Sequence, residues 1–259
     1  MDLELHGRRA IVCAASRGLG RACATALARE GVAVTINARD AEALAATAAE
    51  IGAASGVPVQ AVAGDIAADA TRAALLAACP EPDILVNNNA GPPPGRFQDW
   101  DRDAWLGAVG ANMLAPLEMI RAVLDGMVER RFGRIVNITS AMVKAPQAPM
   151  GLSAGARAGL TSACKALSHQ VASANVTINN LLPERIDTDR QVLMAQLTAA
   201  MNGITVDEAY DRIRAGIPAG RLGRPDEVGD ACAFLCSARA GFITGQNLQL
   251  DGGAYPGLW

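Results

Sequence analysis

The sequence predicts a single α/β domain in which a doubly wound parallel sheet of about seven strands carries helices on both faces. Short β-branched runs alternate with Ala-rich stretches whose apolar residues recur at three- and four-residue spacing. The strand-like runs are apolar throughout, which is typical of parallel strands that are buried on both faces. No internal repeat or low-complexity linker interrupts the 259 residues, so we expect residues 1–259 to form one domain.

The strands and helices follow one another along the chain in that alternation. The first two helices are expected at Arg21–Glu30 and Ala41–Ile51, because both segments have a helical apolar period. Runs rich in Val, Ile and Leu predict the strands, which are Arg9–Cys13, Val32–Asn37, Pro58–Ala63, Ile84–Asn87, Arg134–Thr139, Val176–Leu182 and Asn247–Leu250. Two segments depart from the alternation: the stiff loop Gly91–Gly95 follows a strand end, and residues 187–218 form a helical insertion that we expect to act as a substrate lid.

Composition excludes several classes of function. The net charge of −3 gives no reason to expect nucleic acid or an anionic membrane as a partner. No apolar run of 18 residues and no signal core is present, so we expect a cytoplasmic protein with reduced thiols. Six Cys lie scattered in apolar surroundings, away from the two His, and we interpret them as buried hydrophobic residues. We therefore expect no metal site.

A glycine-containing loop joins the first predicted strand to the first helix. Glycines at this place let the backbone approach a pyrophosphate, and the start of the helix supplies N–H groups and positive potential. The loop predicts a dinucleotide site of the Rossmann type, formed by Ser16, Arg17, Gly18, Leu19 and Gly20.

The end of the second strand indicates which dinucleotide is bound. A carboxylate there would accept a hydrogen bond from a free ribose 2′-hydroxyl, whereas an arginine accommodates a 2′-phosphate. This chain has Asn37, Ala38 and Arg39 at that place, and its first carboxylate is Asp40. Because Arg17 could reach the same phosphate, two guanidinium groups favour NADP(H) as the cofactor. The alternative is that Arg39 is a solvated residue at the start of a helix.

These motifs resemble, in order and spacing along the whole chain, those of the short-chain dehydrogenase/reductase family, and most closely its bacterial 3-oxoacyl-carrier-protein-reductase-like branch. The resemblance rests on the glycine loop and on the segments Gly64–Ile66, Asn88–Gly91, Asn112, Asn137–Ser140, Leu182–Pro183, Gly220–Pro225, Ile243–Gln246 and Asp251–Gly253. It implies a small-molecule substrate and a homodimer or homotetramer. It also implies that Asp65 and Ile66 flank the adenine. By the same resemblance, Asn89, Ala90 and Gly91 would line the adenosine ribose, and Pro183, Ile186 and Thr188 would lie beside the nicotinamide.

The catalytic segment departs from the pattern of that family, whose members carry a Ser, a Tyr thirteen residues later and a Lys four residues beyond. In such a site, the ammonium group favours the phenolate and makes the Tyr a competent acid and base. Ser140 is in place here, and the resemblance adds Asn112, but Ser153 and Arg157 stand where Tyr and Lys are expected. Arg157 could still hydrogen-bond the nicotinamide ribose. A serine hydroxyl is a far weaker acid, and an arginine stays protonated.

Several groups could replace the missing proton donor. Ser153 with Arg157 could relay a proton to water, and Lys144 could supply a proton or bind an acidic group of the substrate. Two smaller departures from the family pattern are Ala14 and Glu184. Ala14 replaces a family glycine and is suited to its place if the local φ is negative. Glu184 puts a carboxylate near the expected nicotinamide, where it could select a basic or hydroxylated substrate.

Three functions are consistent with this pattern. The first is an NADP(H)-dependent oxidoreductase that acts on a carbonyl, alcohol or imine with a non-standard proton donor. The second is a catalytically silent NADP(H)-binding protein that serves as a sensor or partner. The third is a lyase-type enzyme that uses the same pocket without redox chemistry, with Ser140 and Glu184 as acid and base groups.

Overall fold

The seven strands form one parallel sheet, as the sequence predicts. In the computed structural model, which describes residues 2–258, the strand order is β3-β2-β1-β4-β5-β6-β7 and all neighbouring pairs are parallel. The strand bounds are β1 Arg9–Val12, β2 Ala33–Ala38, β3 Val59–Ala63, β4 Ile84–Asn87, β5 Gly133–Ile138, β6 Val176–Pro183 and β7 Asn247–Leu250. Each predicted strand is present, with its ends within one residue of the predicted ones.

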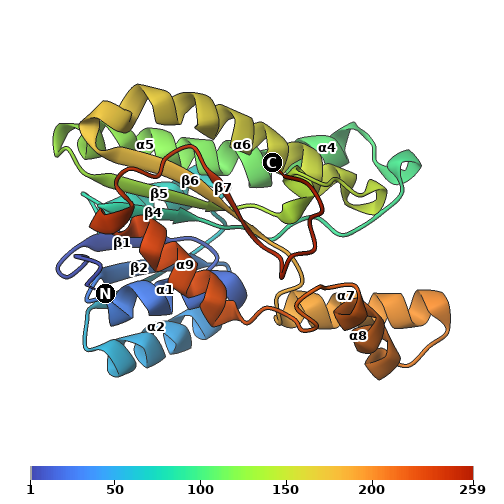
Figure 1. Cartoon of the computed structure of the whole chain (residues 1–259). Coiled ribbons are helices and arrows are strands. Elements are labelled where there is room, and N and C mark those ends of the chain that lie inside the picture. Colours follow the sequence, from blue (N-terminus) through green and yellow to red (C-terminus); the bar gives the residue numbers. More distant parts are fainter. Residues whose placement is uncertain (1, 259) are drawn as a thin grey trace.

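Helices cover both faces of this sheet (Figure 1). One face carries α1, α2 and α9, and the other carries α3, α5 and α6, whose buried side chains form two separate core clusters. The helix bounds are α1 Gly18–Arg29, α2 Ala41–Ser55, α3 Asp69–Ala78, α4 Arg102–Val109, α5 Ala115–Glu129, α6 Gly151–Val171, α7 Asp189–Asn202, α8 Val206–Ala215 and α9 Pro225–Cys236. The first helix begins three residues earlier than predicted, because the glycine loop itself forms its first turn.

The core follows directly from the period of two along each strand. In β1, Ala10 and Val12 belong to the cluster under α1 and α9, whereas Ile11 packs on the opposite face with Leu75 of α3. Most strand side chains are apolar because helices cover both faces of the sheet. Helices α1 and α9 pack closely, since a Cβ added at Gly229 would lie 2.6 Å from the carbonyl oxygen of Ala22.

A row of asparagines interrupts the apolar strands on the face that α6 covers. Asn87, Asn137, Asn180 and Asn247 are register partners on β4, β5, β6 and β7. Each side-chain amide donates to the amide oxygen on the next strand, at 2.9, 2.9 and 2.8 Å. Asn137 also donates toward Cys164 Sγ of α6 at 3.4 Å. These buried amides satisfy one another, as buried polar groups must.

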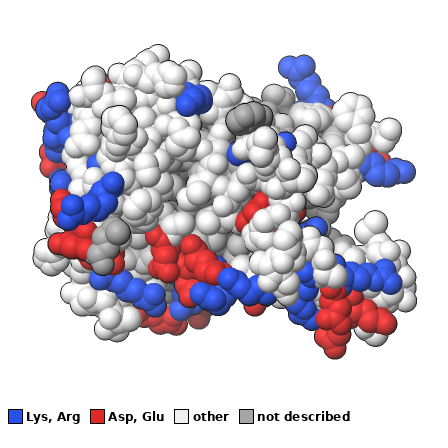
Figure 2. All heavy atoms as spheres, viewed as in Figure 1, with Lys and Arg blue, Asp and Glu red and all other residues white. Residues whose placement is uncertain are grey.

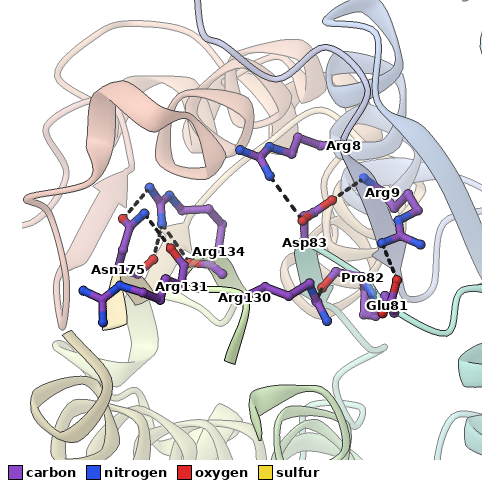
Figure 3. Close-up of polar contacts among 10 residues, drawn as sticks. Arg8, Arg9, Glu81, Pro82, Asp83, Arg130, Arg131, Arg134 and Asn175 are labelled. Carbon is purple, nitrogen blue, oxygen red and sulfur yellow. Dashed lines mark hydrogen bonds and ion pairs between the residues drawn. The ribbon is translucent and has the colours of Figure 1, made fainter. Parts of the chain in front are cut away.

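The amino ends of the strands are sealed by a polar network (Figure 3). Arg134 is 1% exposed and donates to the carbonyl oxygens of Ser237, Gly133 and Asn175. Asp83 accepts from the backbone N–H of Arg9 at 3.0 Å. These contacts tie loops together at this edge, so the opening available to a ligand lies at the opposite, carboxyl edge of the sheet.

The insertion at residues 187–218 is helical, as predicted. Its helices α7 and α8 pack on each other and project beyond the sheet, on the side where α4 also lies (Figure 1). The space-filling view shows a hollow between this segment and the rest of the molecule, and it shows basic and acidic side chains intermixed over this face (Figure 2). Within residues 2–258, no helix is both long enough and apolar enough to cross a membrane.

Candidate active site

The carboxyl edge of the sheet gathers the predicted site residues. The strand order reverses between β1 and β4, so the chain leaves these neighbouring strands toward opposite faces of the sheet. Such a switch point leaves a crevice outside the carboxyl ends of the strands, where ligands of open α/β sheets bind. The glycine loop follows β1 and the segment Asn88–Gly91 follows β4, so both lie at this crevice.

The glycine loop has the shape that a pyrophosphate requires. Gly18 has a φ of +57°, a conformation that favours glycine. A Cβ at Gly20 would lie 2.3 Å from the carbonyl oxygen of Ala14, so only glycine fits under the loop. The conformation of Gly18 and the close approach at Gly20 fit a dinucleotide phosphate at the start of α1. A groove of about 480 Å³ beside this loop runs along α1 toward the start of α9, and its lining includes the carboxylates of Asp187, Asp189, Asp226 and Asp230, so it is not itself the phosphate site.

Ala14 corrects one expectation. We expected a negative φ at this alanine, but its φ is +49°, in the left-handed region where an alanine is strained. The carbonyl oxygen of Ala14 accepts a hydrogen bond from Asn88 Nδ2 at 3.3 Å, which links the ends of β1 and β4. The loop therefore has a left-handed backbone conformation at Ala14, which is more usual for glycine.

The end of β2 is free of a carboxylate that could face a ribose. Asp40 caps α2 by accepting a hydrogen bond from the backbone N–H of Ala43 at 3.0 Å. Its oxygen is thus directed at the helix backbone. Arg39 is exposed beside it, and Asn37 is buried and donates to the carbonyl oxygens of Val62 and Gly64. This arrangement fits a phosphorylated ribose better than a free 2′-hydroxyl.

The residues after β3 and β4 stand at the same edge. Ile66 is buried and Asp65 accepts from the backbone N–H of Ala67 at 2.9 Å, which fixes the turn after β3. Asn89 donates to the carbonyl oxygen of Ala111 at 3.0 Å and accepts from the N–H of Ala90. The structure thus brings these predicted residues to the crevice, and their contacts with the adenine and ribose stay predictions.

Asn112 lies in a π-helical turn, Gly110–Leu114, between α4 and α5. It is 4% exposed, and the carbonyl oxygen of the preceding residue, Ala111, accepts from Asn89. Single π-helical turns are frequently found at functional sites because they redirect side chains and free backbone groups. The turn joins Asn112 to the loop after β4.

Ser153 and Arg157 form a buried pair one helical turn apart on α6. Arg157 Nε donates to Ser153 Oγ at 3.2 Å, and Nη1 donates to the carbonyl oxygens of Ile138 and Thr139 at 2.7 and 2.8 Å. Nη2 donates to the carbonyl oxygen of Asn89 at 3.0 Å. Four of the five N–H donors of the guanidinium are thereby used, and three of them join α6 to the ends of β4 and β5.

Burial changes the acidity of this guanidinium. Removal from water, together with the positive charge of Arg190, lowers the pKa of Arg157 to about 10. The group still carries its charge at neutral pH. Close to it, Ser140 accepts a hydrogen bond from the backbone N–H of Met142 at 3.2 Å. Since Ser140 and Ser153 each accept from an N–H, the O–H of each is directed elsewhere.

Glu184 and Lys144 lie on the side of the site away from the glycine loop. Glu184 lines a cavity of about 490 Å³, together with Arg185 and Arg212. Desolvation raises the pKa of the Glu184 carboxyl, Arg185 at 3.8 Å lowers it, and the carboxylate of Asp251 raises it. Lys144 instead donates to Gln249 Oε1 at 3.2 Å, so its ammonium is bound to β7. The substrate roles of Glu184 and Lys144 stay predictions.

Two contacts attach the α7–α8 segment to the site. Arg17 pairs with Asp189 at 3.4 Å, and both side chains are exposed. Arg190 Nη2 donates to the carbonyl oxygen of Pro92 at 3.3 Å, which bridges α7 and the loop after β4. The sequence analysis missed Arg190. Its position two residues after Thr188, at the start of a predicted lid helix, was the only signal that could have identified it.

Comparison with known proteins agrees with this geometry. A family model described as enoyl-(acyl carrier protein) reductase matches residues 13–255. The chain belongs to the short-chain dehydrogenase/reductase family. Within this family it is similar to 3-oxoacyl-[acyl-carrier-protein] reductase FabG from Vibrio harveyi, with 34% identity over 98% of this chain and 99% of that protein. The predicted family and its 3-oxoacyl-carrier-protein-reductase-like branch are confirmed.

Two further relatives show the range of activities in this family. The NADPH-dependent reductase BacG from Bacillus subtilis is 32% identical over 95% of this chain and 97% of its own length. The crystal structure of L-sorbose reductase from Gluconobacter frateurii, complexed with NADPH and L-sorbose, superposes with a TM-score of 0.93 over 100% of both chains at 26% identity. The names of these three relatives thus describe reductases, two of them linked to NADPH.

Proposed function

We propose that this chain is an NADP(H)-dependent oxidoreductase that reduces a carbonyl or imine, or oxidises the corresponding alcohol or amine, with a non-standard proton donor. The observation that carries the proposal is the buried Ser153–Arg157 pair at the crevice of the dinucleotide fold. It puts a hydroxyl and a positive charge where the family resemblance implies a Tyr and a Lys. NADPH-dependent relatives with the same fold support the choice of cofactor.

The residues that would hold the cofactor form a continuous series along the crevice. Ser16 to Gly20 would bind the pyrophosphate, and Arg39 with Arg17 would bind the 2′-phosphate. Asp65 and Ile66 would flank the adenine, and Asn89 to Gly91 the adjoining ribose. The nicotinamide end would lie by Pro183, Ile186 and Thr188, with Arg157 toward its ribose through the fifth N–H of the guanidinium. When bound, the cofactor supplies or accepts a hydride.

The chain's own contribution is to stabilise the oxygen that gains charge as hydride reaches the carbonyl carbon. The O–H groups of Ser140 and Ser153 would donate to that oxygen, and the Arg157 charge behind Ser153 would favour the developing negative charge. Because Arg157 remains charged at neutral pH, the proton that completes the alcohol would come from water through Ser153. An imine that is already protonated would need no such donor.

A catalytically silent NADP(H)-binding protein is the second candidate. This second candidate is favoured by the three hydrogen bonds that Arg157 donates to the backbone carbonyl oxygens of Ile138, Thr139 and Asn89. These contacts would serve to hold the crevice in shape whether or not a reaction takes place. The lyase-type alternative has Glu184, half-buried at the cavity, as its acid or base.

The test begins with cofactor binding, followed by turnover. Fluorescence titration should show that NADPH binds at least tenfold more tightly than NADH, and Arg39→Ala should remove most of this preference. A panel of ketones, oxo acids, oxo esters and imines should then reveal NADPH-dependent reduction that Ser140→Ala and Ser153→Ala each slow by tenfold or more. Tight NADPH binding without turnover of any compound would favour the silent protein, and tighter NADH binding would contradict the phosphate argument.

A further inference from the structure

A buried threonine interrupts the apolar face of α2. Leu44, Ala48 and Ile51 pack into the core on this face, and Thr47 lies among them with 3% of its surface exposed. A buried hydroxyl is costly unless it is hydrogen-bonded, and a β-branched residue is a weaker helix former than the alanines around it. Neither the packing of the core nor the stability of the helix therefore explains a threonine at this place.

The Thr47 hydroxyl is bonded to the glycine loop and not to its own helix. A threonine inside a helix commonly donates to the carbonyl oxygen three or four residues earlier. Thr161 of α6 and Thr198 of α7 both donate in this way, at 2.8 Å. Thr47 Oγ1 instead donates to the carbonyl oxygen of Ser16 at 2.9 Å, across 31 positions of the sequence. This hydroxyl thus joins α2 to the loop between β1 and α1.

The bond from Thr47 fixes the direction of the peptide group that joins Ser16 to Arg17. In a trans peptide, the carbonyl oxygen and the N–H point in opposite directions within one plane. Because the oxygen of Ser16 is held toward α2, the N–H of Arg17 points away from this helix. The first turn of α1 follows directly, and no side chain caps its N–H groups. A peptide turned the other way would add an acceptor oxygen beside these donors and would repel an anion.

Helix α2 is itself fixed on both sides of this contact. Asp40 caps its first turn, and Arg39 directly precedes the cap. Glu50, one turn after Thr47, pairs with Arg21 of α1. One helix therefore connects the segment at Arg39, which is predicted to bind the 2′-phosphate, with the glycine loop.

We propose that Thr47 is a positioning residue for the cofactor: it keeps the Ser16–Arg17 peptide turned so that the N–H of Arg17 is available to a phosphate group of the dinucleotide. This inference rests on the proposed function, because it takes NADP(H) as the ligand of the glycine loop. Thr47 acts through Ser16 and does not itself need to touch the cofactor. Since successive backbone N–H groups form an anion site together, loss of the Thr47 hydroxyl should weaken the binding of the phosphates while the core stays filled.

The test removes the hydroxyl and measures the binding of NADP⁺ by calorimetry, which does not depend on turnover. Thr47→Val keeps the size and branching of the side chain, and we expect it to raise the Kd of NADP⁺ by about tenfold, because the carbonyl oxygen of Ser16 loses its donor. Thr47→Ser keeps the hydroxyl and should bind NADP⁺ within about threefold of the original protein. Thr177→Val is the matched control. Thr177 is buried near the amino end of β6, its hydroxyl has no hydrogen-bond partner within residues 2–258, and its loss should leave the Kd unchanged.

A second measurement follows the N–H of Arg17 directly. In NMR spectra of the original protein, the amide proton of Arg17 should move to lower field when NADP⁺ binds, because it donates to a phosphate oxygen. In Thr47→Val at saturating NADP⁺ this displacement should be smaller, and in Thr47→Ser it should return. An Arg17 signal that does not move in the original protein overturns the inference.

The outcomes separate this inference from the function on which it rests. Weaker binding in Thr47→Val that Thr47→Ser restores supports the inference, even if no carbonyl compound is reduced. Unchanged binding in Thr47→Val overturns it and leaves the proposed function intact. Equal weakening by Val and Ser also overturns it, because packing and not the hydroxyl would then be responsible. An original protein that binds no NADP⁺ overturns both the inference and the proposed function.

Discussion

The two halves of the crevice, the glycine loop after β1 and the α6 segment after β5, present different chemical groups to a ligand. The glycine loop presents mostly backbone, and the space under Gly20 is set by the carbonyl oxygen of Ala14. The α6 segment presents side chains, a Ser and an Arg that are hydrogen-bonded to each other where the family resemblance implies a Tyr and a Lys. The backbone contact at Gly20 leaves no room for a side chain, whereas different side chains can be placed on one face of a helix.

The α6 half of the crevice is held in place by the hydrogen bonds of Arg157. Arg157 reaches three carbonyl oxygens from the ends of two strands, and a buried cation with that many bonds holds one geometry. In the proposed function, the cofactor site therefore depends mainly on the backbone, whereas the proton donor depends on the side chains of Ser153 and Arg157. Four variants test this difference between the two halves.

The largest expected effect comes from restoring the family's pair. The double variant Ser153→Tyr with Arg157→Lys should raise kcat for ketone reduction by about 10²-fold or more, because a positioned general acid contributes about 10²–10⁴-fold. The value of kcat would be obtained from stopped-flow recording of NADPH oxidation at saturating cofactor. Ser153→Phe with Arg157→Lys is the control, since it adds the ring without the hydroxyl. A double variant no faster than this control would show that the missing Tyr does not limit the reaction.

A smaller but still large effect is expected in the glycine loop. Gly20→Ala places a Cβ against the backbone oxygen of Ala14, so the loop must shift and the Kd of NADPH should rise by about 30-fold or more. Gly107→Ala is the matched control, because a Cβ there has no neighbour within 4 Å. It should bind NADPH normally and unfold at the same temperature or slightly higher. Unchanged binding in Gly20→Ala would exclude this loop as the pyrophosphate site.

The third variant tests whether Arg157 also supports the fold. Arg157→Gln leaves carbonyl oxygens of Ile138, Thr139 and Asn89 without donors, so the free energy of unfolding should fall by about 2–4 kcal/mol. Urea denaturation followed by circular dichroism would measure the change. The exposed Arg214→Gln should alter it by less than about 0.5 kcal/mol. Equal stability of Arg157→Gln and the original protein would mean that water replaces these bonds.

The smallest effect concerns Glu184 and depends on pH. Desolvation raises the pKa of this carboxyl in the folded state above its value in the unfolded chain. The folded protein therefore binds more protons between those two values, and the contribution of Glu184 to stability falls as pH rises through that window. Glu184→Gln should raise Tm by a few degrees at most at pH 7 and have no effect near pH 4. A variant that loses stability at pH 7 would indicate that the pair with Arg185 outweighs desolvation.

The fold could be predicted from the sequence almost completely, and the site in part. The apolar runs located all seven strands because both faces of a parallel sheet demand them, and the glycine loop marked the crevice. The left-handed φ of Ala14 was not predicted, because an alanine rarely adopts that conformation. The contact of Arg190 with Pro92 and the bonds of Arg157 to three backbone carbonyl oxygens join segments that are distant in the sequence, and local patterns indicate such contacts poorly. The homodimer or homotetramer and the cytoplasmic location stay predictions.

The asparagine row across β4 to β7 has a consequence for how the sheet assembles. Strands that are apolar on both faces could pair two residues out of step and still bury every side chain. Such a shift would break the three amide-to-amide hydrogen bonds that join Asn87, Asn137, Asn180 and Asn247. These hydrogen bonds therefore favour one register of β4 to β7, and in that register the carboxyl ends of the four strands lie side by side at the site.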